Sequence, residues 1–223
     1  YHFNDMHFSS EKLSSKDVLT LTSDFANANF EGTIDVPNLF NSFFAYLSPH
    51  FPLLNKGRNK AQNFVFEVDL FNTSALTNLF IPQLNLGDGA SITGSFNNRG
   101  EGLSLAVESP NLGWGKWLWR DLKINSKATS QHWEIGLTGA KLDFNNRTKI
   151  ENIEIDQVGN YGDWRYAMAW ISNDSIKFDG IVKGAASVDT KSLNIGIEES
   201  QFYFADTLWT VNESSKIKYS KNK

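Results

Sequence analysis

The chain has 223 residues, of which 40% are hydrophobic and 13% aromatic, including 17 Phe and 7 Trp. This composition excludes a disordered chain and suits one large all-β domain or two smaller domains. The formal net charge is −4 and the basic residues are scattered, which argues against nucleic acid as a partner. The absence of cysteine excludes disulfides and thiolate metal sites.

The helical signals lie within the first 85 residues. The stretch "DVPNLFNSFFAYLSPHFP" predicts an amphipathic helix over residues 38–48, since Pro37 suits a first turn and apolar residues follow at helical spacing. The stretch "TSALTNLFIP" predicts a second short helix that ends at Pro82. Residues 64–70 alternate between them as a strand. We expect the first helix to pack against the sheet, because its apolar face needs a partner.

After residue 84 the sequence is almost entirely strand and turn, with turns every ~8–12 residues. Each strand carries one apolar and one polar face, as an antiparallel sheet with one wet side requires. We therefore predict a mainly β fold in one elongated domain. Residues 1–85 would hold strands and two short helices, and residues 86–223 a continuous β-ladder. Such a sheet closes as a sandwich or barrel, or curls into a trough with its apolar side inward.

No constellation of residues points to catalysis. The four histidines are far apart and match no metal-ligand spacing, and no G-x-S-x-G motif occurs. The stretch "GDGASITG" lacks the Lys-Ser/Thr ending of a phosphate-binding loop and precedes a strand, so it indicates a hairpin turn. The Trp-rich stretch "GWGKWLWRD" could stack on sugars, although strand alternation favours core or groove lining. We predict no enzymatic activity, no cofactor and no metal.

Four segments follow one another in register from about residue 20 to 219, as the spacing of their motifs shows. The first has a strand ending in A-x-x-x-G, then a helix and a Tyr-Phe-Pro-like close, at Ala28, Gly32, Tyr46, Phe51 and Pro52. The second is the strand, short helix and hairpin of "FVFEVDLFNTSALTNLFIPQLNLGDGASITGSFN". The third is a W-x-x-N…G segment at Trp170, Asn173 and Gly180, and the fourth contains Ser200, Asp206 and Trp209. Together they resemble the TamB proteins of Bacteroidota, members of the AsmA-like superfamily.

This resemblance implies a long periplasmic sheet, curled like a taco, whose hydrophobic groove conducts phospholipids between the inner and outer membranes and supports outer-membrane biogenesis. It implies an inner-membrane anchor in a segment not present here. It also implies a BamA-type outer-membrane barrel as a partner, engaged through regions outside this chain. The remainder of the same polypeptide is expected to continue the ladder at both ends.

The alternating apolar residues are the candidates for the lipid groove, because acyl chains need a continuous apolar surface and no specific polar contact. The candidates are Leu103, Leu105, Trp133, Ile135, Leu137, Trp164, Tyr166, Met168, Trp170, Leu193, Ile195, Ile197, Phe202 and Phe204. The alternatives are a scaffold for outer-membrane protein assembly and translocation, with strands held by edge pairing, or a carbohydrate-binding β-sandwich.

Two further sites follow from short motifs. Asp174-Ser175-Ile176 and Asp206-Thr207-Leu208 resemble the motif that periplasmic Bacteroidota proteins carry for O-glycosylation, so Ser175 and Thr207 are candidate acceptors.

Overall fold

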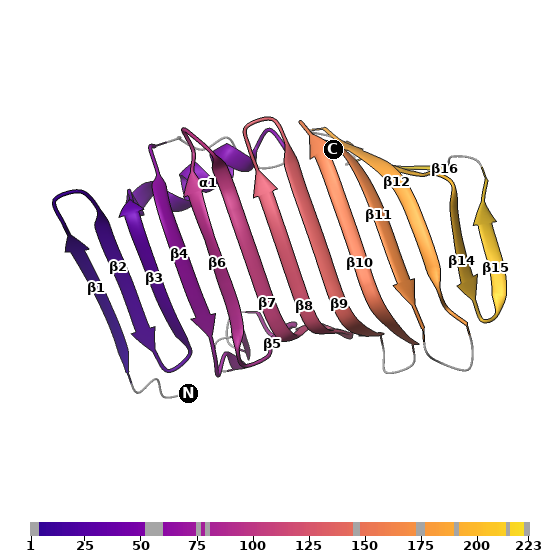
Figure 1. Ribbon diagram of the computed structural model, residues 1–223, viewed down its shortest axis with the longest axis horizontal. Coiled ribbons are helices and arrows are strands. Elements are labelled where there is room, and N and C mark those ends of the chain that lie inside the picture. The colour runs from indigo at the N-terminus through magenta and orange to yellow at the C-terminus, as the bar shows by residue number, and fades with distance from the viewer. Residues whose placement is uncertain are drawn as a thin grey trace.

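The computed structural model describes residues 5–51, 60–74, 77–78, 81–144, 148–172, 177–189, 192–212 and 215–220. The protein is mainly β, and its strands form one long antiparallel sheet that does not close (Figure 1). The sheet passes from β4 to β6 without a break, so the ladder spans the predicted boundary at residue 85. The expected elongated sheet is confirmed.

The elements alternate strand and turn along almost the whole chain. They are β1 (Met6–Lys12), β2 (Asp17–Ser23), β3 (Ala26–Thr33), the 3₁₀ turn η1 (Val36–Asn38), α1 (Leu39–Leu47), β4 (Asn63–Leu70), β5 (Leu84–Leu86), β6 (Ala90–Asn97), β7 (Gly102–Trp114), β8 (Trp117–Ala128), β9 (Trp133–Phe144), β10 (Thr148–Asn160), β11 (Asp163–Ile171), β12 (Gly180–Val188), β13 (Ser192–Ile197), β14 (Ser200–Phe204), β15 (Thr207–Val211) and β16 (Ser215–Ser220).

Neighbouring strands in the sheet are mostly neighbours in sequence, in the order β1-β2-β3-β4-β6-β7-β8-β9-β10-β11-β12. Beyond β12 the sheet forks. One branch continues through β13 to β16, which pairs with β13, and the other consists of the hairpin β14–β15, which joins β12 near Gly180 and Ile181. The buried hydroxyl of Ser200 receives a hydrogen bond from Lys183 N (3.0 Å) and ties the second branch to β12.

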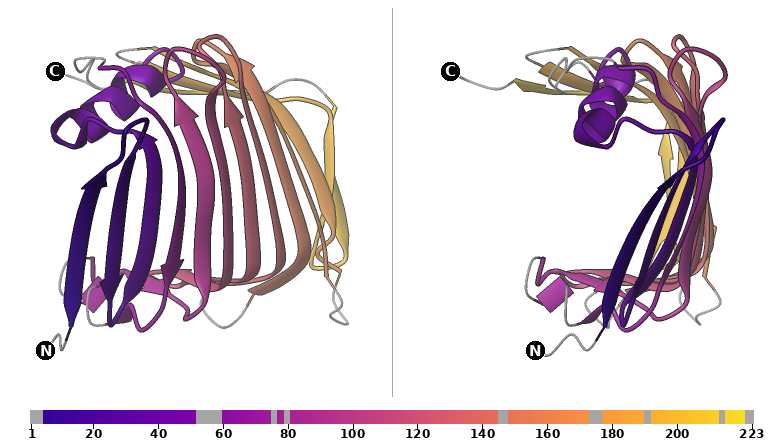
Figure 2. Two further views of the ribbon diagram at one scale, coloured as in Figure 1. Left: turned by 60° about the vertical axis from the view of Figure 1, so that its left-hand side comes forward. Right: turned by 90° about the vertical axis from the view of Figure 1, so that its left-hand side faces the viewer.

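The sheet is curved, and α1 lies on its concave side near the ends of the strands (Figure 2). A packed core forms where α1 meets the sheet. It contains Leu19, Ile34, Tyr46, Leu47, Phe64, Phe96, Leu103 and Ala128. The predicted helix over residues 38–48 is therefore present, and it packs on the apolar side of the sheet as expected.

The structure delimits one α-helix, α1, where the sequence predicts two short helices. Much of the second expected helix falls on residues 75–76 and 79–80, which lie outside the described residues. Thr77 N donates to Thr73 O (2.9 Å), while the Thr73 hydroxyl donates to Leu86 O in β5 (2.9 Å). Ser74, Thr77 and Asn78, which belong to this segment, are helical, and Ile81 N donates to Thr77 O (2.7 Å) with the same helical spacing.

Candidate functional site

The strand register decides which side chains share a face of the sheet. Residues directly opposite each other on antiparallel strands point to the same side, and residues two apart on one strand do likewise. Leu103 pairs with Ala128, which lies opposite Trp133, and the Tyr46 hydroxyl of α1 donates to Ala128 O (3.2 Å). The face that contains Leu103 and Trp133 is thus the concave one. We call it the apolar face and the opposite, convex side the outer face.

By this register, the predicted groove residues share the apolar face. Leu103, Trp133, Trp164 and Ile195 occupy one line across the strands, and Leu105, Ile135, Tyr166 and Ile197 the next. Leu137 and Met168 follow in a third line, and Leu193 lies two residues from Ile195 on β13. Trp170 lies opposite Gly180, which in turn pairs with Phe202. Phe204 comes two residues after Phe202, near the exposed tip of the β14–β15 hairpin.

One line of this face contains no polar residue from β1 to β12. It consists of eleven paired residues, Phe8, Leu21, Ala28, Val68, Ile92, Val107, Ile124, Leu137, Ile155, Met168 and Val182. We call it the central apolar row. With about 4.8 Å between neighbouring strands, it spans roughly 50 Å, which exceeds the roughly 30 Å of a bilayer's hydrocarbon core.

Of the eleven residues in this row, the predicted set contains Leu137 and Met168, and Ile124 and Val182 are two of the nine that it left out. Both stand in period-two stretches, "LKINSKA" and "GIVKGAAS", that are short and interrupted by small or polar residues. Their pairing with Val107 and Met168 is what places them in the row. These residues can therefore be found only from the register between strands, because no pattern within a single strand reveals it.

Aromatic rings lie over glycines on the apolar face. Trp170 pairs with Gly180, and a Cβ built on this glycine would lie 2.5 Å from Cζ2 of Trp170. Gly184 faces the ring of Tyr166, and the Tyr166 hydroxyl donates across to Gly196 O (3.0 Å). Glycine in a strand commonly marks such a close approach, and an aromatic ring across the pair restores the lost packing. The rings consequently lie close to the backbone at these positions.

The upper part of the apolar face is covered and the rest is not. Phe43 of α1 packs edge-on against Phe96 (ring centroids 5.7 Å), and Phe51 inserts between Trp133 (4.4 Å) and Trp164 (5.0 Å). From β9 to β13 the side chains of this face are mostly half-buried. A closed core would bury them fully, so most of the face beyond α1 is accessible.

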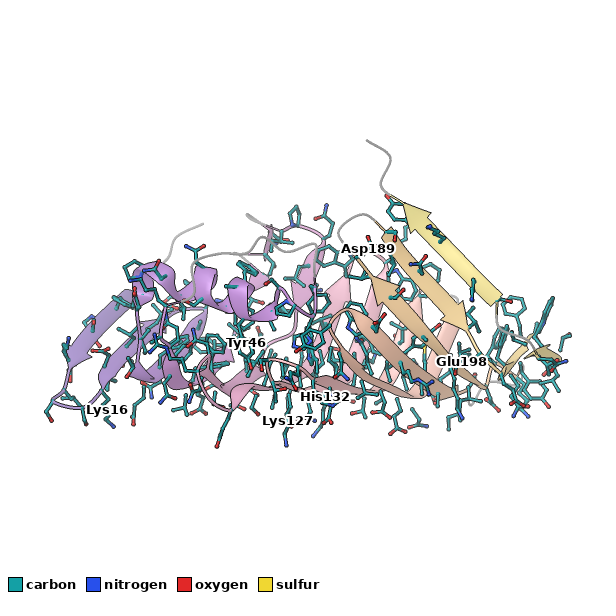
Figure 3. The ribbon with its side chains drawn as sticks, turned by 90° about the horizontal axis from the view of Figure 1, so that it is seen from above. Lys16, Tyr46, Lys127, His132, Asp189 and Glu198 are labelled. Atoms are coloured by element: carbon teal, nitrogen blue, oxygen red, sulfur yellow. The ribbon has the colours of Figure 1, made fainter. Side chains whose placement is uncertain are left out.

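The outer face is mostly polar. Lys127 points away from the side that holds α1 and Tyr46 (Figure 3), and by register it lies opposite Glu134. Lys123 and Glu108, also paired on this face, form an ion pair (3.2 Å). Two hollows of about 570 and 980 Å³ are lined largely by outer-face residues. They do not coincide with the apolar face, which is an open curved surface rather than a cavity.

Within the described part of the chain, three groups have a pKa raised above its usual value. Burial raises the pKa of Tyr46, and burial together with the charge of Glu198 raises the pKa of Tyr166. Hydrogen bonds with Asn160 (2.8 Å) and then Glu134 (2.9 Å) raise the pKa of His132 above its usual value, at the turn between β8 and β9. The hydroxyls of Tyr46 and Tyr166 donate hydrogen bonds to backbone carbonyls, so these two side chains have a structural role.

The described part of the chain offers no group of three His, Asp or Glu side chains that could hold a metal ion. None of its helices is long and apolar enough to span a bilayer. Of the two candidate glycosylation sites, Thr207 is exposed at the start of β15, whereas Ser175 lies outside the described residues.

The Trp-rich stretch occupies the turn between β7 and β8. Trp114 and Trp117 face each other across this turn and are exposed, and Trp117 contacts Phe144 (ring centroids 4.4 Å). They do not join the packed core under α1. The strands form a single sheet, so the two packed layers of a sandwich are not formed among the described residues.

Comparison with protein-family models, curated proteins and solved structures finds no match to this chain. The resemblance to TamB proteins therefore stays a prediction from the sequence segments.

Proposed function

We propose that the apolar face binds the acyl chains of phospholipids and lets them move across the strands, as one segment of a TamB-like bridge between the inner and outer membranes. The observation that carries this proposal is the central apolar row, which crosses eleven strands without a polar residue.

The energetics favour such a surface for lipid movement. An acyl chain exposed to water costs about 0.8 kcal/mol per CH₂, so a 16-carbon chain carries a cost of roughly 13 kcal/mol. A surface that offers equivalent apolar contacts at each strand removes this cost at every position. Because no position binds the acyl chain more tightly than the next, the chain can move across the strands. The repeated pairing of Ile, Leu, Val and Met along the row provides such equivalence.

The edges of the sheet support a longer assembly. Phe8 on β1 and Ile217 on β16 are exposed and lie on the apolar face, and among the described residues each of these edge strands pairs on one side only. Unpaired edges with apolar residues invite a further strand. In the proposed setting, the remainder of the same polypeptide supplies these strands, and regions outside this chain provide the inner-membrane anchor and the contact with a BamA-type barrel in the periplasm.

The same edges favour a second candidate function. A scaffold for outer-membrane protein assembly would hold unfolded strands by pairing them with β1 or β16. It would use the backbone of the edge strands rather than the side chains in the middle of the apolar face. A change in the middle of this face should therefore impair lipid movement and leave the scaffold role intact.

A photo-crosslinking residue at Met168, in the intact protein in cells, tests the lipid proposal. Lys183 is the matched control, because it lies on the adjacent strand, is exposed and belongs to the outer face by its pairing with Ala167. We expect phospholipid adducts at Met168 and none at Lys183. Adducts at neither position, in folded variants, would contradict lipid passage and favour the scaffold.

A further inference from the structure

Helix α1 is apolar on two sides. Its inner side, which includes Phe43, Tyr46 and Leu47, packs into the core on the sheet. On its other side Phe40 is 73% exposed and Phe44 is 44% exposed, one helical turn apart, and Val36 of η1 extends the line at 49% exposed. We call these three residues the outer stripe.

The outer stripe lacks the polar surroundings typical of a helix facing water. The nine residues Leu39–Leu47 contain no charged side chain. Asn41 is the one polar residue of α1 that is exposed, since Ser42 is buried and its hydroxyl accepts a hydrogen bond from Lys60 N (3.1 Å). A surface helix of a globular protein normally turns a polar face outward. Contiguous exposed apolar residues mark contacts with a membrane, a ligand or another protein.

Aromatic contacts connect this stripe to the apolar face. The ring of Phe44 lies against that of Phe43 (6.1 Å between centroids), and Phe43 packs edge-on against Phe96 (5.7 Å). Phe96 pairs with Leu103, at the upper line of the apolar face. A hydrocarbon chain that leaves Phe44 therefore meets aromatic rings, and no charged side chain of α1, on its way to the sheet.

We propose that the outer stripe docks on a phospholipid surface, with Phe40 and Phe44 inserted at the boundary between headgroups and acyl chains, and that α1 is where acyl chains pass onto the apolar face. Helices that lie in this boundary insert bulky apolar side chains such as Phe and Leu. A protein partner would need charged or polar groups around the stripe to fix the orientation and specificity of the contact. Helix α1 offers one such group, the amide of Asn41. This inference rests on the proposed function.

The test replaces the stripe without touching the core. The double variant Phe40→Ser/Phe44→Ser changes two exposed side chains. The control is Val65→Ser/Val158→Ser, which removes two exposed apolar side chains from the outer face, at 55% and 42% exposure. Each chain is measured for flotation with phosphatidylethanolamine/phosphatidylcholine vesicles. A second assay measures binding of a short-chain, monomeric phosphatidylcholine, which reaches the apolar face without a bilayer.

We expect the stripe variant to bind vesicles about tenfold more weakly than the native chain and its control, a difference of about 1.4 kcal/mol. It should bind the monomeric lipid as the native chain does. Unchanged flotation of the stripe variant would overturn the inference. Equal losses in both assays would also overturn it, because the stripe would then support the sheet rather than dock.

The two proposals fail in different ways. If the native chain floats with vesicles through the stripe yet binds no monomeric lipid, the lipid-binding role of the apolar face is wrong, while the stripe remains a membrane contact. If the native chain binds monomeric lipid and never floats, the docking role is wrong, and the apolar face keeps its function.

Discussion

The replacement Leu137→Glu tests the central apolar row most directly. Leu137 lies on β9 between Ile124 and Ile155, in the middle of the row. About four methylene groups of an extended acyl chain span the 4.8 Å between neighbouring strands. At about 0.8 kcal/mol per methylene, losing their contacts at one strand costs about 3 kcal/mol. A carboxylate that must shed water as the chain passes adds to this cost.

An added barrier of about 3 kcal/mol slows passage roughly a hundredfold, since each 1.36 kcal/mol is a factor of ten in rate. The assay is the rate at which the protein transfers a fluorescent phospholipid from donor to acceptor vesicles. The matched control is Thr138→Glu, the next residue on β9, which is exposed on the outer face opposite Lys123. Its transfer rate should equal that of the native protein.

Leu137 is half-buried, so the substitution should leave the fold intact, which circular dichroism and thermal unfolding check. Native-like transfer by a folded Leu137→Glu protein would refute the reasoning, because the lipid path could not then cross the central apolar row.

Two further predictions concern stability. Gly184→Ala should destabilise the fold by about 1–3 kcal/mol, measured by urea denaturation, because the new methyl group would overlap Tyr166 and the backbone of β13; an unchanged midpoint would show that the ring is not held against the glycine. NMR titration should give His132 a pKa above 6.5 in the folded protein, lowered by either Asn160→Ala or Glu134→Gln. Because the folded pKa is the higher one, the resulting stability is fully present below pH 6.5 and is lost as the pH rises through the folded pKa. A folded-state pKa of 6.5 or less would contradict this interpretation.

Local sequence patterns predicted most of the elements. Alternation at Trp164, Tyr166, Met168 and Trp170 predicts strand β11 and puts these residues on one side of it, because side-chain direction in a strand repeats every two residues. Pro37 and the apolar spacing that follows predict α1. These features depend on residues within a few positions of one another. Of the second predicted helix, Ser74, Thr77 and Asn78 are helical, and residues 75–76 and 79–80 lie outside the described residues. Spacing alone does not reveal that the Thr73 hydroxyl bonds to β5.

The tertiary structure decided which strand faces lie in line. Alternation within a strand shows which side of that strand Ile124 or Ile155 occupies. Only the pairing of β8, β9 and β10 puts both residues in line with Leu137. A slip of one residue in any pair would turn one strand's apolar side outward. The curvature of the sheet, the placement of α1 on its concave side and the exposure of Phe40 likewise follow from contacts between distant segments. The sequence therefore determined that an apolar face exists, and long-range pairing decided that it is continuous, open and bordered by an exposed apolar helix.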